Sequence, residues 1–161
     1  MKARDIMTSS VITVSPESTI QEIARLLHGN RISGVPVVNN ENEVIGIITE
    51  GDLIIKIAKP HLPAHIELLG GIIYLRRPQE MDDELKKITA ALAKDIMTEK
   101  VITVEENCDI EDIASLMVNR KINHLPVVRD RKLIGIITRG DVIETLAGEA
   151  APLDENIPDA T

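Results

Sequence analysis

Short runs of β-branched residues alternate with longer stretches of helical periodicity in the first third of the chain. Val11–Val14, Val35–Val38 and Val44–Ile48 are rich in valine and isoleucine, a composition that favours strands. The polar turn Asn39–Asn42 separates the second run from the third. These two runs therefore predict a β-hairpin, and the first predicts a separate short strand.

Two amphipathic helices are predicted around these strands. One apolar face is formed by four residues at the spacing i, i+3, i+4, i+7, namely Ile20, Ile23, Ala24 and Leu27. Ser18–Gln21 has the form of a capping box, with a hydroxyl at the N-cap and a glutamine three residues later. A second helix is predicted to begin near Gly51–Asp52. The predicted order is strand, helix, strand, strand, helix.

The same pattern occurs a second time, and such internal repeats indicate the architecture directly. Ala3 recurs as Ala93, an offset of 90 residues, and Ile45 recurs as Ile134, an offset of 89. The one-residue difference falls in the polar turn, where a fold tolerates length changes. The paired segments are Ala3–Thr8 with Ala93–Thr98, Val11–Val14 with Val101–Val104, Val35–Val38 with Leu125–Val128, and Ile45–Asp52 with Ile134–Asp141. One repeat alone cannot cover its sheet and both helix faces, but two repeats facing each other can.

Residues 60–92 have no counterpart in the second repeat. Pro60–Pro63 is a break, Ile66–Leu75 is apolar around two glycines and predicts a tight turn between short arms, and Glu80–Leu92 has a helical pattern. This insert is either a cap on apolar surface of the pair or a self-association surface. The tail that follows the second repeat is predicted to be flexible.

Composition narrows the possible functions. The chain has a net charge of −8, one tyrosine and no Phe or Trp, so it lacks the basic footprint and the aromatic side chains that nucleic-acid binding uses. A single cysteine, Cys108, excludes an internal disulfide and fits a reducing compartment. No signal-like or membrane-spanning apolar run is present. We therefore expect a cytoplasmic protein that binds neither nucleic acid nor membranes.

The repeat resembles the CBS domain, the module named after cystathionine β-synthase. The resemblance rests on Asp5–Thr8, Val35–Val38, Gly46–Thr49 with Gly51–Asp52, and the second copy of each. It implies an α/β fold with two β-α-β-β-α repeats about a pseudo-two-fold axis, two clefts between them, and a homodimer. The predicted organisation is a first repeat at 1–59, an inserted linker at 60–92, a second repeat at 93–147 and a flexible tail at 148–161.

A Thr-x-x-Asp motif follows the last strand of each repeat, at Thr49–Asp52 and Thr138–Asp141. The motif is first of all a helix-capping signature. In CBS pairs that bind adenosine derivatives the matching threonine and aspartate hold the ribose, and the resemblance carries this role to Thr138 and Asp141. It carries the same role less firmly to Thr49 and Asp52.

The two motifs differ in charge, because Arg139 in the second copy stands where the first has Glu50. A guanidinium there can hold a phosphate through a charge-assisted hydrogen bond, whereas a glutamate would repel one. The alternative for Arg139 is an exposed arginine at a helix start. The second motif therefore predicts the better nucleotide site.

The residues that enter the second strand of each repeat also differ, with Ser33–Gly34 in the first repeat and Asn123–His124 in the second. The resemblance implies that this stretch lines the cleft and that basic residues here contact phosphate. His124 is thus a second phosphate candidate whose charge would make binding depend on pH. The alternative is a solvated histidine at a strand entrance.

By family geometry, residues of the opposite repeat complete each site. Thr8, Thr13 and Ile32 would face Asp141, with the backbone near Thr13 reading the base edge. For Ile32 the alternative is core packing. The full set of ligand-binding candidates is Thr8, Thr13, Ile32, Ser33, Thr49, Asp52, Thr98, Thr103, Asn123, His124, Thr138, Arg139 and Asp141.

Other chemistry finds little support in the sequence. His61 and His65 have metal-ligand spacing, but Pro63 between them argues against a helix and no third ligand lies near. Cys108 occupies the position of Ser18 and has no adjacent base. Phosphate-loop, dinucleotide and nucleophile-elbow motifs are absent. We therefore predict neither an enzyme nor a metal site.

The leading hypothesis is a regulatory sensor that binds AMP, ADP, ATP, S-adenosylmethionine or an NAD-type ligand in the cleft between the repeats. The main alternative is a ligand-free dimerisation scaffold that regulates a partner protein in trans. An unidentified enzyme or transporter is the candidate for a regulated partner, and whether the module acts alone or in trans stays open.

Overall fold

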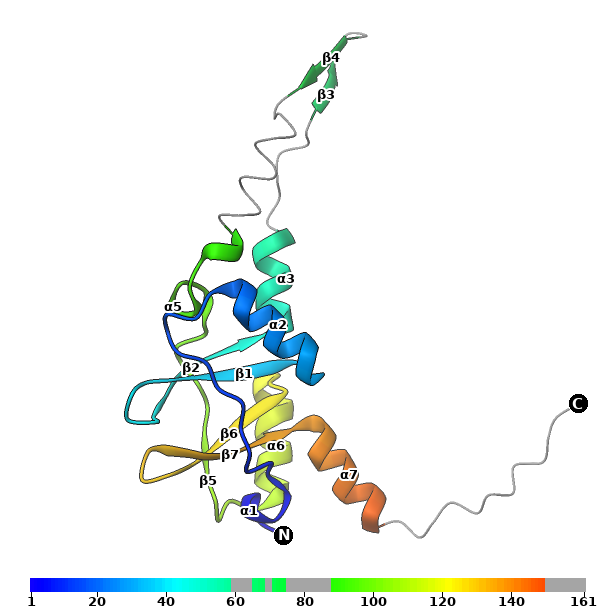
Figure 1. The fold of residues 1–161 in the computed structure, drawn as a ribbon. Coiled ribbons are helices and arrows are strands. Elements are labelled where there is room, and N and C mark those ends of the chain that lie inside the picture. Colours follow the sequence, from blue (N-terminus) through cyan, green and yellow to red (C-terminus); the bar gives the residue numbers. More distant parts are fainter. Residues whose placement is uncertain (59–64, 69–70, 75–87, 150–161) are drawn as a thin grey trace, which may run out of the picture. The chain divides into compact units, whose positions relative to one another are not determined.

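The computed structural model describes residues 1–58, 65–68, 71–74 and 88–149 (Figure 1). The chain forms two compact units. Unit 1 consists of Met1–Val11 and Ile102–Thr161, and unit 2 consists of Ile12–Val101. Neither unit coincides with one sequence repeat, because the first residues of each repeat belong to the unit built by the other repeat.

Unit 2 contains the predicted hairpin and both predicted helices of the first repeat. Strands β1 and β2 are antiparallel, Gly34 pairs with Thr49, and a bulge interrupts the register between Val37 and Val38. The elements are α2 (Ile20–Asn30), β1 (Gly34–Val38), β2 (Val44–Thr49), α3 (Glu50–Ala58) and α5 (Ala93–Ile96). The strand predicted at Val11–Val14 is reduced to one parallel bridge between Val14 and Val37, so that prediction was wrong for this copy.

The capping box of α2 lies one residue later than predicted. Thr19 is the N-cap: its hydroxyl accepts from Glu22 N at 3.2 Å, and Glu22 Oε2 accepts from Thr19 N at 2.8 Å. Ser18 Oγ instead accepts from Ser15 N at 3.2 Å. Ser18 and Thr19 are adjacent hydroxyl residues, so the sequence alone did not show which of them caps the helix. Because Ser18 Oγ bonds to Ser15 N, Thr19 is the residue that caps α2.

The core of unit 2 is aliphatic and includes a residue from the second sequence repeat. Ile23, Val35, Val37 and Ile48 are completely buried, and Ala93 of α5 is buried with them. Ala93 N donates to Ser18 O at 2.8 Å. Beyond α5, Thr98 exchanges backbone hydrogen bonds with Ile47 of β2. The segment at the start of the second repeat therefore completes the unit built by the first.

Unit 1 has the full predicted order of strand, helix, strand, strand and helix. Its sheet has the order β5-β6-β7, with β5 parallel to β6 and β6 antiparallel to β7. The elements are α1 (Ala3–Ile6), β5 (Val104–Glu105), α6 (Ile110–Arg120), β6 (His124–Arg129), β7 (Lys132–Thr138) and α7 (Arg139–Glu149). Helix α7 includes residues 148 and 149, which the sequence assigned to the tail.

The core of unit 1 mirrors that of unit 2. Ala3 of α1 is completely buried in a cluster with Ile113, Leu125, Val127 and Ile137. Its backbone N–H donates to Cys108 O at 2.8 Å. Thr8 and Ile136 pair through backbone hydrogen bonds of 2.9 and 3.0 Å. The segment at the start of the first repeat thus completes the unit built by the second.

A methionine and a glycine fit together at each of these exchanged segments. A Cβ atom on Gly135 would overlap the side chain of Met7, and one on Gly46 would overlap Met97. The two glycines lie in β7 and β2, where the missing side chain makes room for the methionine. The Asp-Ile-Met-Thr motif of each repeat therefore packs against the Gly-Ile-Ile-Thr motif of the other repeat.

The insert contains one further hairpin in its described part. Strand β3 (His65–Leu68) pairs antiparallel with β4 (Gly71–Tyr74), with His65 opposite Tyr74. The two arms predicted on either side of a turn do pair, and residues 69–70 of the turn lie outside the described residues. Of the predicted helix at 80–92, residues 88–90 are helical and 80–87 lie outside the described residues, as do Gly70 and residues 150–161. A search of the described residues finds no helix long and apolar enough to span a membrane.

The ion pair between Lys2 and Asp109 joins the start of α1 to the start of α6 in unit 1. Lys2 Nζ donates to Asp109 Oδ2 at 2.8 Å, and this hydrogen bond lowers the pKa of Asp109 below its ordinary value of 3.8. A carboxylate with a lowered pKa stabilises the fold above its ordinary value, and the contribution disappears as the pH falls through the lowered pKa.

We therefore expect Asp109→Asn to lower the melting temperature at pH 7 but not near pH 2. Thermal denaturation of both proteins across this range measures the difference. An equal deficit at both pH values would contradict an ionic contribution.

Candidate functional site

The turn from β7 into α7 holds the Thr138–Asp141 motif in a fixed geometry. Asp141 Oδ2 accepts from Thr138 N at 2.6 Å and from Thr138 Oγ1 at 2.8 Å. The equivalent bonds from Thr49 to Asp52 are 2.7 and 2.9 Å. The predicted capping role is confirmed at both motifs. In each aspartate these bonds use Oδ2, and among the described residues no group donates to Oδ1.

Asp141 lines a pocket of about 450 Å³, which we call the Asp141 pocket. Its lining residues are Met1, Asp5, Ile6, Asp141, Glu144, Thr145 and Gly148. The equivalent Asp52 pocket of unit 2 has a volume of about 200 Å³ and is lined by Asp52, Ile55, Lys56, Asp95 and Ile96. Small-molecule pockets usually exceed about 300 Å³. The Asp141 pocket passes this threshold and the Asp52 pocket does not.

The two pockets also differ in charge. Asp5, Asp141 and Glu144 place three carboxyl groups around the Asp141 pocket. In the Asp52 pocket, Lys56 accompanies two aspartates. A phosphate group is therefore unfavourable inside the Asp141 pocket itself and needs cations from elsewhere in the unit.

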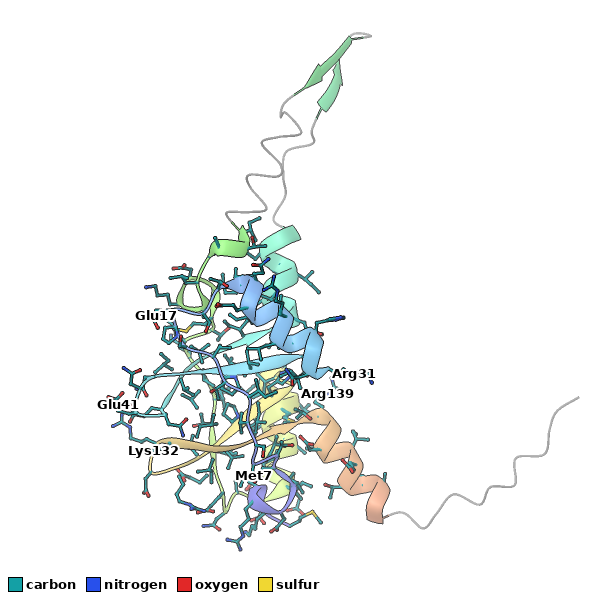
Figure 2. The ribbon with its side chains drawn as sticks, in the orientation of Figure 1. Met7, Glu17, Arg31, Glu41, Lys132 and Arg139 are labelled. Atoms are coloured by element: carbon teal, nitrogen blue, oxygen red, sulfur yellow. The ribbon has the colours of Figure 1, made fainter. Side chains whose placement is uncertain are left out.

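Those cations lie in a third pocket of about 360 Å³, the Arg139 pocket, also in unit 1. Its lining residues are Met117, Val118, Lys121, Ile122, Asn123 and Arg139. The backbone N–H of Arg139 donates to Asn123 O at 3.3 Å, and Arg139 Nη1 donates to Asn123 Oδ1 at 3.5 Å. Figure 2 shows the Arg139 side chain at the start of α7. Arg139 and Asp141 thus line different pockets, two residues apart on one helical turn.

Lys121 also lines the Arg139 pocket, but it was not among the ligand-binding residues predicted from the sequence. It is the C-cap residue of α6 in the left-handed conformation, with φ of 54°. This turn ends the helix and brings Lys121 to the same pocket as Arg139, eighteen positions later in the sequence. The only available signal was its place two residues before the predicted Asn123.

His124 begins β6 and is buried, with 9% of its surface exposed. The alternative of a solvated histidine was therefore wrong. His124 lies opposite Thr138 in the β6–β7 ladder, which places it in the same strand pair as the Thr138–Asp141 motif. Contact between His124 and phosphate stays a prediction.

The ligand-binding candidates predicted from the sequence are distributed over the two units. Unit 1 contains Thr8, Thr103, Asn123, His124, Thr138, Arg139 and Asp141, and unit 2 contains Thr13, Ile32, Ser33, Thr49, Asp52 and Thr98. Ile32 packs against the core of unit 2, so its core-packing role is confirmed. Ser33 O accepts from Glu50 N at 2.9 Å. The ligand roles of Thr13 and Ile32 at Asp141 stay predictions.

Cys108 is not an activated nucleophile. The residue is half-buried, and burial, followed by the nearby Asp112 and Asp109 carboxylates, raises the pKa of its thiol. A raised pKa keeps the sulfur in the unreactive thiol form. The part of the chain that the structure describes contains no group of three His, Cys, Asp or Glu residues placed to hold a metal, and His61 lies outside that part.

Comparison with known proteins adds to this geometry. The model of a family described as CBS domain matches residues 3–59 and 93–148. The Methanocaldococcus jannaschii protein MJ1426 is 35% identical over 154 residues, covering 91% of each protein. The structure of CBSX2 in complex with AMP is 25% identical, with a TM-score of 0.70, and covers 92% of this chain and 97% of that chain.

A further structure shares the fold alone. The CBS domain pair of MJ0100, solved with 5-methylthioadenosine and S-adenosyl-L-methionine, is 24% identical with a TM-score of 0.72. The match covers 93% of this chain and 98% of that chain. The likeness thus spans both units and is not confined to one repeat.

Proposed function

Because the chain belongs to the CBS domain family and contains a tandem pair of its repeats, we propose that it is a regulatory module that binds an adenine nucleotide in unit 1. The relative MJ1426 matches over 91% of each protein, so a protein of similar length contains the same pair of repeats. The observation that carries the ligand proposal is Asp141, which lines a pocket of about 450 Å³. The AMP complex of the related CBSX2 supports the choice of ligand class.

Asp141 is suited to hold a ribose. Its Oδ2 is occupied by the two bonds from Thr138, which fix the orientation of the carboxylate. Its Oδ1 can then accept from the vicinal hydroxyls of a ribose, and a hydrogen bond to a charged group contributes about 1.5–3 kcal/mol. In this proposal the capping role and the ligand role belong to different oxygens of one side chain.

The phosphate would be held at the Arg139 pocket. A guanidinium presents a planar fork that matches phosphate oxygens, and an ammonium adds a mobile point charge. Arg139 and Lys121 supply one of each. The three carboxyl groups of the Asp141 pocket repel phosphate from that side, so the charges of unit 1 favour one orientation of the nucleotide.

Unit 2 is the weaker candidate. Its motif has Glu50 at the position of Arg139, and its pocket is less than half the size, about 200 Å³ against 450 Å³. We therefore assign the nucleotide to unit 1. The glutamate in place of an arginine in the Thr49–Asp52 motif is also what the ligand-free scaffold alternative would expect.

Arg139→Ala should weaken AMP binding by at least about tenfold, because the variant loses a charge-assisted hydrogen bond to phosphate. Adenosine, which has no phosphate, should bind both proteins equally. Calorimetric titration with each ligand measures the two affinities, and Glu50→Ala is the matched control at the other motif. Equal losses for AMP and adenosine would show that Arg139 does not contact the phosphate.

The proposal as a whole is tested by a dye-based thermal-shift screen against AMP, ADP, ATP, S-adenosylmethionine and NADH, with zinc as the metal control. A ligand at a hundred times its dissociation constant stabilises the protein by about 2.7 kcal/mol, or several degrees for a chain of this size. A shift with an adenine ligand supports the sensor function. No shift with any of them would favour the ligand-free scaffold.

We propose that the module acts as a homodimer through α3 and α7. Ile54 and Ile55 on α3 and Ile143 and Leu146 on α7 are between 58% and 63% exposed, and such apolar residues on a helix often mark an interface. Ile143→Lys should reduce the sedimenting mass to that of one chain. Val118→Lys on α6, at a residue that is 75% exposed, is the matched control and should leave the mass unchanged.

A further inference from the structure

The Arg139 pocket is larger and more apolar than a phosphate contact requires. Its volume is about 360 Å³, whereas pockets that hold a whole small molecule usually exceed about 300 Å³. Three of its lining residues, Met117, Val118 and Ile122, are apolar, and two, Lys121 and Arg139, are cations. The phosphate of AMP would contact the cations and leave the apolar side chains uncovered.

Val118 is the apolar side chain of this pocket that is open to a ligand. It is 75% exposed, whereas Met117 is 6% exposed and Ile122 packs partly against the core of unit 1. Val118 therefore offers its apolar surface to an occupant of the pocket and not to the core. In unit 2 the same helix position carries His28, so this apolar surface is a feature of the unit to which the nucleotide is assigned.

The two cations of the pocket match the charge of a diphosphate bridge. Each phosphorus of a diphosphate diester carries one negative charge, and Lys121 and Arg139 carry one positive charge each. Arg139 is held by its hydrogen bonds to Asn123, while the flexible stem of a lysine lets its ammonium reach a second phosphate. Among the described residues that line this pocket, none is a carboxylate.

We propose that the ligand of unit 1 is a dinucleotide of the NAD type, bound preferentially in its reduced form. This inference rests on the proposed function, in which Asp141 holds the ribose of the adenosine. The diphosphate contacts Arg139 and Lys121, and the nicotinamide packs on Val118 and Ile122. The oxidised nicotinamide ring is a cation, and burying a charge against apolar side chains with no carboxylate to pair with it is unfavourable. The reduced ring is neutral, so the module distinguishes the two redox forms.

Fluorescence titration with NADH tests this ligand class, because reduced nicotinamide is fluorescent and the chain has no tryptophan to interfere. Calorimetric titrations with AMP and NAD⁺ complete the comparison. We expect NADH to bind at least about tenfold more tightly than AMP, because its nicotinamide covers apolar surface that AMP leaves in water. We expect NADH to bind at least about fivefold more tightly than NAD⁺, because only the reduced ring is neutral.

Val118→Asn tests the proposed position of the nicotinamide. The residue is 75% exposed, so the change removes apolar contact surface in the pocket without disturbing the core. The variant should weaken NADH binding about fivefold and leave AMP binding unchanged. His28→Asn, at the matched helix position of unit 2, is the control and should change neither affinity.

The affinity for AMP separates this inference from the proposed function. The inference is overturned, while the adenosine site stands, if AMP binds and NADH binds no more tightly. The same conclusion follows if NAD⁺ binds as tightly as NADH, or if Val118→Asn changes the affinities for AMP and NADH equally. If neither AMP nor NADH binds, the proposed function itself is overturned, and the inference with it.

Discussion

Replacing Asp141 with alanine is expected to weaken AMP binding by at least about a hundredfold. The variant removes the acceptor proposed for both ribose hydroxyls, and two hydrogen bonds to a charged group contribute about 1.5–3 kcal/mol each, where 1.4 kcal/mol is a factor of ten in affinity. Calorimetric titration of AMP into both proteins measures the loss. Asp141→Asn retains an acceptor for Thr138 but not the charge, so its affinity for AMP should lie between those of the unaltered protein and Asp141→Ala.

The control for this experiment is Asp52→Ala. Asp52 makes the same two bonds to Thr49 that Asp141 makes to Thr138, so both variants lose one helix cap worth about 1 kcal/mol. Only Asp141→Ala should lose the nucleotide. If the two variants bind AMP equally well, the ribose is not held by Asp141. If both lose binding and melt at equally lowered temperatures, the motif acts only as a cap.

Ala3→Asp should destabilise the unit built mainly from the second repeat, although residue 3 belongs to the first. Ala3 is completely buried in the core of unit 1, and an uncompensated buried charge costs about 3–5 kcal/mol. Hydrogen exchange resolved by peptide should show faster exchange in β6 and β7. Strands β1 and β2, which belong to unit 2, should change much less.

The matched variant is Ala93→Asp. Ala93 is as completely buried as Ala3 but lies in the core of unit 2, so the pattern should reverse, with β1 and β2 exchanging faster. Together the two variants test the exchange of first segments between repeats. If Ala3→Asp instead loosened β1 and β2, each repeat would be folding upon its own first segment.

Local structure was largely predictable from the sequence because its causes are local. The β1–β2 and β6–β7 hairpins follow from β-branched runs on either side of polar turns, and α2 and α6 follow from apolar residues at helical spacing. The prediction of a strand at Val11–Val14 was wrong, and the reason is local as well. In the second copy Val104 and Glu105 both pair with β6, whereas in the first the N–H of Ser15 turns to Ser18 Oγ and only Val14 pairs.

The exchange of segments was not predictable, because spacing along the chain does not show which glycine a methionine will meet. Met7 has a glycine in each repeat to pack against, and only the fold selects Gly135. In the candidate site, likewise, contacts between residues close in sequence were predictable and contacts between distant residues were not. The hydrogen bonds of Thr138–Asp141 are three residues apart in sequence and were expected, while Lys121 reaches the Arg139 pocket only through a left-handed turn.

The exchanged segments also determine how this protein can be divided. Cutting the chain within residues 60–92 gives two fragments. The first fragment keeps α1 but lacks α5, which belongs to its core, and the second keeps α5 but lacks α1, which belongs to its core. Each half alone would therefore expose an apolar core and remain poorly folded. Mixed together, the halves would each supply the helix that the other lacks, which makes the chain a natural substrate for fragment complementation and for split reporters whose signal depends on reassembly.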